Sequence, residues 1–439
     1  GSAQIGLDGG TFVLTTGGVV TTRVDVNGTL KLGAAGLIPD TTWISLSSAG
    51  IFDLNGFIET IGRYTSSSGT EVKLGSGTLT TINVHGSSSQ GQITGAGNWT
   101  VQGSGEFNVY SNNTYTGTTI IDGPQFNAWN VNALGDTFGG TTVNSGMLLL
   151  GTSGQTFTEP LTLTGGTGRG YGTLENYGGD NTWAGSITLD ATSWIGTTFN
   201  NGNLTVSGPI GGPGGLTISS QPSSKVTLSG TNNYVGTTTV SVGTILIVDA
   251  SIASTATTTV KGILGGTGTI DGPVVVNSGG KLAPGASPGI LSVGSTTLAN
   301  NSTFEVEIGG TTAGNLTTNH DQLDVTGTVT IGTNVTLSTL QFNGFVPVAG
   351  DTFAILKNDG TDLVSGTFNG LSEGGVIANF LGTGLPAYIT YVANIDAGSV
   401  GNDVVLTFNP DLIPPTVTGT SPSFATSGTL AVGATSLSV

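Results

Sequence analysis

The chain contains no cysteine, a single methionine (Met147) and only two histidines, His85 and His320. Without cysteine, neither a disulfide framework nor a thiolate metal site can form. The two histidines stand alone and far apart in the sequence, so a histidine-based zinc site is excluded as well. These absences remove the disulfide-rich and the zinc-dependent classes of protein.

Charged residues are also scarce, at 8% of the 439 positions. Nine Lys and Arg are outnumbered by 26 Asp and Glu, which gives a net charge of −17. Such a chain repels phosphate backbones, so we expect no nucleic-acid binding. No run approaches the ~18 consecutive apolar residues of a membrane-spanning helix, so we expect no such helix.

What the sequence does contain is glycine, at 76 positions, and short runs in which apolar residues alternate with Thr, Ser or Asn. Clear examples are the segments 24–32, 141–150 and 303–308. A period of two is typical of strands, and β-branched Thr and Val favour the half-buried surface of a sheet. The sequence therefore predicts an all-β protein, with at most a helical turn near residues 376–381.

The strands also repeat. Residues 107–121 (FNVYSNNTYTGTTII) match residues 226–240 (VTLSGTNNYVGTTTV), which aligns Tyr115 with Tyr234. A long array of short strands with small corner residues predicts a parallel β-solenoid. At about 20–25 residues per turn we expect about 16–20 turns and, at ~4.8 Å per coil, a rod of about 80–100 Å. A row of β-sandwiches stays open as the alternative, because the long offset between the two copies also permits it.

Several of the repeated segments resemble a family of bacterial surface sequences. Residues 52–62 (FDLNGFIETIG) and 95–119 (GAGNWTV…YTGTT) resemble the autotransporter-associated β-strand repeat. Residues 266–294, with the core APGASPG, resemble the passenger-associated transport repeat. The resemblance covers nearly all of residues 25–410. It implies a right-handed parallel β-helix that is secreted or displayed on the bacterial cell surface, where such proteins commonly serve as adhesins, fibres or stalks.

These patterns divide the chain into three parts. Residues 1–300 are expected to form β-helix repeats, and residues 301–410 a C-terminal solenoid and capping region. Residues 411–439 form a linker and an extended, strand-rich tail. The tail is either the start of an Ig-like domain or a donor strand that adds to a neighbouring subunit through Leu430, Val432, Leu437 and Val439.

No catalytic group stands out, so we expect no enzymatic activity. Glu305 and Glu307 form the nearest carboxylate pair, but they alternate with apolar residues and belong to the outer face of one strand. His320 and Asp321 precede a strand and are expected in a surface turn. A polysaccharide-acting enzyme would need carboxylates that converge from different coils.

Two kinds of ligand are compatible with the remaining residues. Asp and Asn at coil corners can supply oxygen ligands for Ca²⁺, and the candidates are Asp359, Asp362 and Asp403. No other cofactor is expected. Exposed tryptophans could stack on sugar rings, and the candidates are Trp43, Trp129, Trp183 and Trp194. Trp99 aligns with Leu216 of the second repeat copy and is expected in the core.

The sequence thus predicts an extracellular structural solenoid that forms a surface filament or stalk by head-to-tail assembly with copies of itself. A glycan- or surface-binding adhesin is the first alternative, and a polysaccharide-acting enzyme is the second.

Overall fold

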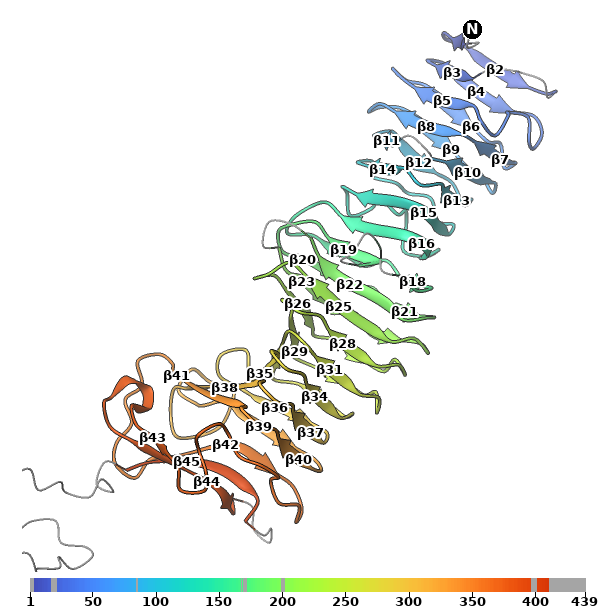
Figure 1. Ribbon diagram of the computed structural model, residues 1–439. Coiled ribbons are helices and arrows are strands. Elements are labelled where there is room, and N and C mark those ends of the chain that lie inside the picture. The colour runs from blue at the N-terminus through green and yellow to red at the C-terminus, as the bar shows by residue number, and fades with distance from the viewer. Residues whose placement is uncertain are drawn as a thin grey trace, which may run out of the picture.

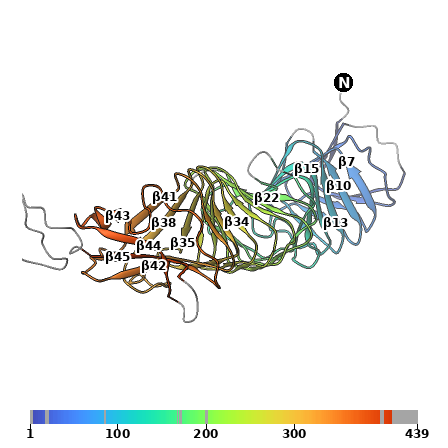
Figure 2. The same ribbon diagram turned by 60° about the horizontal axis from the view of Figure 1, so that its bottom comes forward.

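The computed structural model describes residues 4–16, 22–83, 86–166, 168, 172–198, 202–395 and 401–409. Its strands pair in parallel with those of the neighbouring coils and build an elongated β-solenoid of about 14 turns (Figures 1 and 2). The predicted all-β parallel solenoid is confirmed, and the alternative row of β-sandwiches is wrong.

The number of turns is lower than expected because the coils differ in length. In an early coil Arg23 pairs with Trp43, which is a short step along the chain. Near the C-terminus Thr296 pairs with Val329, so one coil there contains a longer segment of the chain. The last part of the described chain forms a cap instead of further coils. About 14 coils at ~4.8 Å each give a rod of about 65 Å, plus the cap.

Each regular coil places one strand on each of three faces, always in the same order. Face 1 contains β1 (Gln4–Leu7), β3 (Arg23–Val26), β5 (Trp43–Leu46), β8 (Arg63–Ser66), β11 (Ser87–Ser89), β14 (Glu106–Val109), β19 (Leu174–Asn176), β22 (Ser193–Thr197), β25 (Leu216–Ser220), β28 (Thr238–Val240), β31 (Thr258–Val260), β34 (Val274–Val276), β37 (Thr296–Leu298) and β40 (Val329–Ile331).

Face 2 is built from two separate sheets. They contain β2 (Thr11–Leu14), β4 (Thr29–Leu32), β6 (Ile51–Asp53), β9 (Glu71–Lys73) and β12 (Gln92–Thr94), and then β17 (Thr156–Phe157), β20 (Asn181–Trp183), β23 (Leu204–Val206), β26 (Lys225–Leu228), β29 (Ile245–Val248), β32 (Ile263–Gly266), β35 (Lys281–Pro284), β38 (Thr303–Ile308) and β41 (Thr336–Gln341).

Face 3 completes the triangle. It contains β7 (Ile58–Ile61), β10 (Thr78–Ile82), β13 (Asn98–Gln102), β18 (Leu161–Leu163), β21 (Ile187–Leu189), β24 (Ile210–Gly211), β27 (Thr231–Asn232), β30 (Ser251–Ile252), β33 (Thr269–Ile270), β36 (Ile290–Val293), β39 (Gln322–Val325) and β42 (Thr352–Asn358).

Two long strands join faces 3 and 1 in the middle of the rod. The first half of β15 (Thr119–Ala128) pairs with β13, and its second half pairs with β14. β16 (Thr141–Leu150) then pairs along both halves of β15. Between β12 and β17 the chain forms loops on the side of face 2, so the described chain has no strands on this side there.

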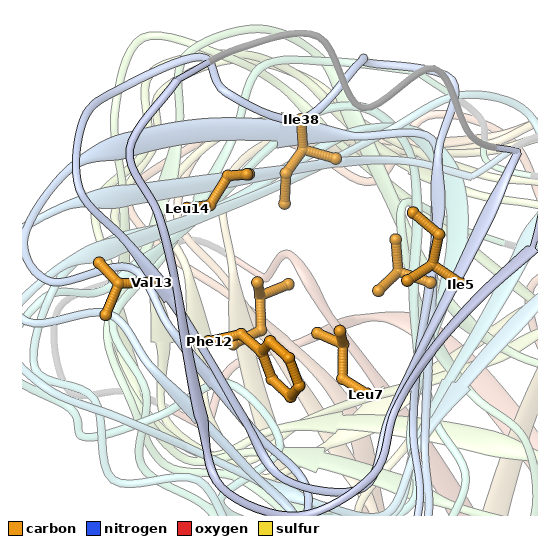
Figure 3. A pocket seen from close by; sticks show the side chains of 8 residues that line it. Ile5, Leu7, Phe12, Val13, Leu14 and Ile38 are labelled. Carbon is orange, nitrogen blue, oxygen red and sulfur yellow. The ribbon is translucent and has the colours of Figure 1, made fainter.

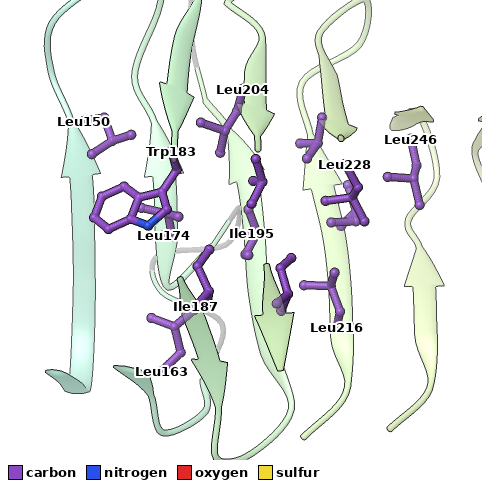
Figure 4. Close-up of a cluster of buried hydrophobic side chains, with 14 of the residues drawn as sticks. Leu150, Leu163, Leu174, Trp183, Ile187, Ile195, Leu204, Leu216, Leu228 and Leu246 are labelled. Atoms are coloured by element: carbon purple, nitrogen blue, oxygen red, sulfur yellow. The ribbon is translucent and has the colours of Figure 1, made fainter. Parts of the chain in front are cut away.

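The core follows from the two-residue period of the strands. In β3, β5 and β29, every second side chain is buried and the others point outward. Leu, Ile and Val of successive coils therefore stack in the interior (Figure 4). Two tryptophans, Trp99 and Trp183, are fully buried in this core, as expected for Trp99.

The repeated motifs form coil corners. In the DLNG segment, Leu54 is buried, whereas Asn55 and Gly56 adopt φ values of 52° and 83°. Asn and Gly tolerate this left-handed region, which explains their place in the motif. The Nδ2 of Asn55 also donates a hydrogen bond to the carbonyl of Leu32 on the preceding coil, at 3.1 Å.

The YTGTT and YVGTT segments build one buried hydrogen bond twice. The Tyr115 hydroxyl lies 2.5 Å from Thr119 Oγ1, and the Tyr234 hydroxyl lies 2.5 Å from Thr238 Oγ1. Thr119 itself donates to the carbonyl of Leu134, so the Tyr115 hydroxyl must be the donor to Thr119. The sequence repeat is therefore also a structural repeat.

Beyond residue 300 the coils continue in the same sheets until an antiparallel cap covers the last one. β42 pairs with β45 (Asp403–Phe408), β45 with β44 (Ala387–Ala393), and β44 with β43 (Val376–Ile377). In place of the predicted turn near 376–381, β43 is followed by a short 3-10 helix, Phe380–Gly382. Residues 411–439, with the predicted assembly positions Leu430, Val432, Leu437 and Val439, lie outside the described residues.

Aromatic residues fill the space between the last coil and the cap. Phe368 stacks on Phe304 with a centroid separation of 5.9 Å and an angle of 5°. Phe380 packs on Phe353 at 5.5 Å. The C-terminal end of the hydrophobic core is thereby closed. No helix among the described residues is long and apolar enough to cross a membrane.

Candidate functional site

The four tryptophans proposed for sugar stacking occupy different environments. Trp183 is wrong as a surface candidate, because it is fully buried and stacks on Phe157 at 5.7 Å and 6°. Its side chain lies at one of the inward-facing positions of β20. The short sequence pattern around Trp183 does not show which positions face inward.

Trp43 is only partly buried, but its ring is already occupied. The guanidinium carbons of Arg23 and Arg63 lie 3.9 Å and 4.3 Å from the ring centroid. The two arginines belong to the coils before and after, because β5 lies between β3 and β8. Since a cation covers the ring from each side, Trp43 offers no free face to a sugar.

Trp129 lies at the end of β15, at the edge of face 1, and belongs to a row of surface aromatics. Its ring stacks on Tyr110 with a centroid separation of 5.8 Å and an angle of 10°. On its other side it meets Tyr177 edge-on, at 5.8 Å and 67°. We call Tyr110, Trp129 and Tyr177 the aromatic row.

The strand register explains why these three residues meet. Val109 pairs with Ala128, Ala128 with Leu150, and Leu150 with Asn176. The residues that directly follow these paired positions on successive coils are Tyr110, Trp129, Gly151 and Tyr177. They therefore lie in one column along the rod. Tyr110 and Tyr177 are three coil spacings apart, or about 14 Å.

Gly151 makes room for the tryptophan within this column. A Cβ atom at Gly151 would lie only 2.4 Å from Cε3 and 2.5 Å from Cδ2 of Trp129. The indole therefore covers the backbone of Gly151 and reaches toward Tyr177. Any other residue at position 151 would displace the ring.

Polar side chains beside the row hold the indole in place. Trp129 Nε1 donates to Asn108 Oδ1 at 2.7 Å, and Asn127 Nδ2 donates to the same oxygen at 2.9 Å. Asn127 Nδ2 also reaches Glu106 Oε1 at 2.6 Å. The orientation of Trp129 is thus fixed by its hydrogen bond to Asn108, whose side chain is in turn held by Asn127.

An open pocket of about 420 Å³ lies next to the row. Its lining is polar and consists of Gly69, Thr70, Glu71, Gln90, Gln92 and Asn112. Ser89 pairs with Val109, so the residues that follow them, Gln90 and Tyr110, lie side by side on neighbouring coils. Gln90 therefore occupies the position before Tyr110 in the column of the aromatic row. The side-chain amides of Gln90 and Gln92 have no hydrogen-bond partner among the residues that the structure describes. We call this hollow the amide pocket.

Trp194 is half-buried in the middle of face 1. It faces Thr217 on the next coil and donates no hydrogen bond to the aromatic row. A role for Trp194 in sugar binding stays a prediction.

The sequence analysis missed Tyr110, Tyr177 and the glutamines. Trp129 follows Tyr110 after a single coil, whereas Tyr177 follows Trp129 only after a much longer stretch of sequence. A glycine, Gly151, occupies the column between Trp129 and Tyr177. Because the coils differ in length, no fixed period would have aligned these positions.

The carboxylates form a second cluster, at a pocket of about 160 Å³ whose lining includes Glu305, Glu307 and Asp321. Glu305 and Glu307 do point outward from β38, as predicted. Glu305 binds Lys281, with Nζ to Oε2 at 2.8 Å. The expected surface turn at His320 and Asp321 is wrong, because both side chains are buried.

Asp321 serves the local fold with both of its oxygens. Oδ1 accepts a hydrogen bond from the amide of Gly289 at 2.7 Å, and Oδ2 accepts one from the amide of Glu307 at 2.6 Å. Burial raises the pKa of Asp321 to about 7, against the opposing effect of these hydrogen bonds. Burial lowers the pKa of His320, whose Nδ1 lies 3.0 Å from the carbonyl of Gly310.

The calcium candidates do not gather into one site. Asp403 is buried, and its oxygens accept hydrogen bonds from the amides of Asn358 and Ile395, both at 2.9 Å. Asp359 Oδ1 accepts one from the amide of Gly327 at 2.6 Å. Within the described ranges, no group of three or more Asp, Glu or His side chains is placed to hold a metal ion. Calcium binding by Asp359, Asp362 and Asp403 stays a prediction.

The N-terminal end of the described rod is open, in contrast to the capped end. Its pocket of about 240 Å³ is lined by Ile5, Leu7, Phe12, Val13, Leu14, Val24, Leu30 and Ile38 (Figure 3). Within the described residues, β1 and β2 each pair on one side only, with β3 and β4. Apolar side chains and free strand edges therefore coincide here.

Comparison with known proteins gives two partial matches. The chain is 39% identical to the "Adhesin BmaC autotransporter" of Brucella suis biovar 1 (strain 1330) over 106 residues, which are 24% of this chain and 3% of that protein. It is 41% identical to the "Uncharacterized lipoprotein YdeK" of Escherichia coli (strain K12) over 76 residues, or 17% of this chain and 6% of that one. No family model matches the sequence.

These matches fit the predicted resemblance only in its coarser form. The solenoid fold and the similarity to part of an autotransporter adhesin are consistent with an autotransporter passenger-like β-helix. The matched stretches span a small fraction of both relatives, so the activities and partners of those whole proteins are not transferred to this chain.

Proposed function

We propose that this chain is a surface-displayed structural rod that serves as the stalk or shaft of a bacterial adhesin-like protein. The observation that carries this proposal is the pairing of each coil with the next along face 1, with a single apolar core running along the rod. Such a scaffold supplies length and a regular outer surface. The similarity to part of an autotransporter adhesin supports a location outside the cell.

The N-terminal and C-terminal ends of the rod differ in how well they could join a second copy in head-to-tail assembly. Pairing between copies would join the open pocket at Ile5 and Phe12 to the other end of a second rod. That other end is covered by the antiparallel cap, whose Phe368 and Phe380 already occupy the end of the core. The closed cap favours a stalk over a filament built by stacking whole rods. A filament would then depend on residues 411–439.

Two experiments test this proposal. Protease treatment of intact cells of the source organism should release peptides of this chain into the medium. Electron microscopy and sedimentation of the purified full-length chain should show single rods about 65 Å long, plus the cap. Recovery of the chain only after cell lysis would contradict the surface location. Long filaments that vanish when residues 411–439 are deleted would replace the stalk with the filament.

A further inference from the structure

We propose that the aromatic row and the amide pocket together form a binding site for a neutral glycan chain lying along the rod. This inference names a ligand for the surface rod and therefore rests on the proposed function for its biological setting. The binding itself depends only on the residues of this one surface.

The first argument is the chemistry of the surface. Sugar rings present apolar C–H faces and a rim of hydroxyls, so they need flat apolar partners beside hydrogen-bonding groups. Tyr110 and Tyr177 expose 46% and 36% of their surface. The near-parallel rings of Tyr110 and Trp129, with centroids 5.8 Å apart, must be laterally offset, so neither ring fully covers the other.

The second argument is the set of unused hydrogen-bonding groups. The amides of Gln90 and Gln92, which have no partner in the described part of the chain, each offer one acceptor and two donor hydrogens. Both line the pocket that lies one coil from Tyr110. A pyranose in this pocket would meet free amides, and the following sugars of the same chain would meet rings.

The third argument is preorganisation and length. The column from Gln90 to Tyr177 spans four coil spacings, or about 19 Å, which is long enough for several sugar residues. Trp129 is held by its hydrogen bond to Asn108 and by the backbone of Gly151 beneath it. A ring that is already fixed loses little conformational entropy when a ligand binds.

Charge selects among glycans. Glu71 lines the pocket and Glu106 lies beside the row, where it accepts a hydrogen bond from Asn127. No arginine lines the pocket or belongs to the row, and Lys73 Nζ lies 3.5 Å from Glu71 Oε2. The whole chain carries a net charge of −17. Uronic acids and sulfated sugars would be repelled, so the ligand is an uncharged oligosaccharide whose hydroxyls can donate to these carboxylates.

The test measures binding of defined sugars to the full-length chain by saturation-transfer NMR and isothermal titration. The probes are the neutral hexasaccharides of cellulose, laminarin, starch and mannan, with polygalacturonate as the anionic comparison. We expect at least one neutral hexasaccharide to bind and polygalacturonate not to bind. In Trp129→Ala and in the Gln90→Ala/Gln92→Ala double variant, affinity should fall about tenfold or more, as for a central contact in an interface.

Trp43→Ala is the matched control, because Trp43 is another part-buried tryptophan of face 1 outside the row and Arg23 and Arg63 already cover its ring. It should bind as the unmodified chain does. The proposal is overturned if none of the four neutral sugars binds, or if binding survives unchanged in Trp129→Ala. It is also overturned if Trp43→Ala loses as much affinity as Trp129→Ala. Because these measurements use purified protein, they do not depend on the cell-surface test of the stalk, and either proposal can fail alone.

Discussion

The cap is the clearest place to test how stability is distributed along the rod. Phe368 is buried, stacks on Phe304, and donates its backbone amide to the Tyr391 hydroxyl at 3.0 Å. Phe368→Ala would remove the ring that closes the core. A fully buried Phe→Ala change costs about 3–5 kcal/mol.

This loss should stay local. In a solenoid each coil touches only its neighbours, so a weakened cap exposes the last coils and leaves distant ones unaffected. We expect amide exchange in residues 329–393 to accelerate by about two to three and a half orders of magnitude, since each ~1.4 kcal/mol is a factor of ten. Exchange in residues 58–128 should not change.

Hydrogen exchange followed by mass spectrometry measures both regions in one experiment. Phe138→Ala is the control, because Phe138 is 87% exposed and its removal should leave exchange unchanged. Equal acceleration in the N-terminal and C-terminal coils would refute the local account and show that the rod unfolds as one unit. No acceleration at all would refute the role of Phe368 in closing the core.

Three further predictions concern single residues. Because the pKa of Asp321 is raised from 3.8 to about 7, the folded chain binds this proton more tightly than the unfolded chain; stability should therefore fall as pH rises from about 4 to about 7. Thermal melts of Asp321→Asn should show a weaker fall, and an unchanged pH profile would contradict this account. Tyr115→Phe and Tyr234→Phe each remove a buried hydroxyl from the same hydrogen bond, so each should cost about 1 kcal/mol in denaturant unfolding; a large loss in only one would show that the repeats are not equivalent. Gly151→Ala should displace the ring of Trp129 and lower stability by about 1–3 kcal/mol, with a change in near-UV circular dichroism; an unchanged spectrum would contradict the close contact.

The sequence was sufficient for the architecture because the architecture depends on local patterns. Alternation in segments such as 303–308 specified strands, and the DLNG and YTGTT motifs marked corners that the structure contains. The antiparallel cap could not be predicted from such local patterns. β44 alternates as the coil strands do, and no local pattern marks the antiparallel pairing of β42 with β45.

The candidate site could be predicted only in part, because it depends on register between coils of unequal length. Trp129 was identified from its residue type alone. Its partner Tyr177 lies two coils further along the column, and Gly151 between them has no side chain to suggest a role. The sequence predicts Trp183 on the surface because a two-residue alternation does not reveal its phase in a short strand. It predicts Asp321 there because a polar residue just before a strand is typical of a surface turn.

The direction of the hydrogen bonds gives the rod a particular response to mechanical force. Strands lie across the rod, so the bonds between coils point along its length. Tension between the two ends would load these bonds a few at a time and peel off one coil after another. A coil of about 20 residues would release up to about 70 Å of chain at ~3.4 Å per residue. A stalk built in this way would lengthen in steps under load, and optical-tweezer traces with one abrupt rupture of the whole rod would rule this out.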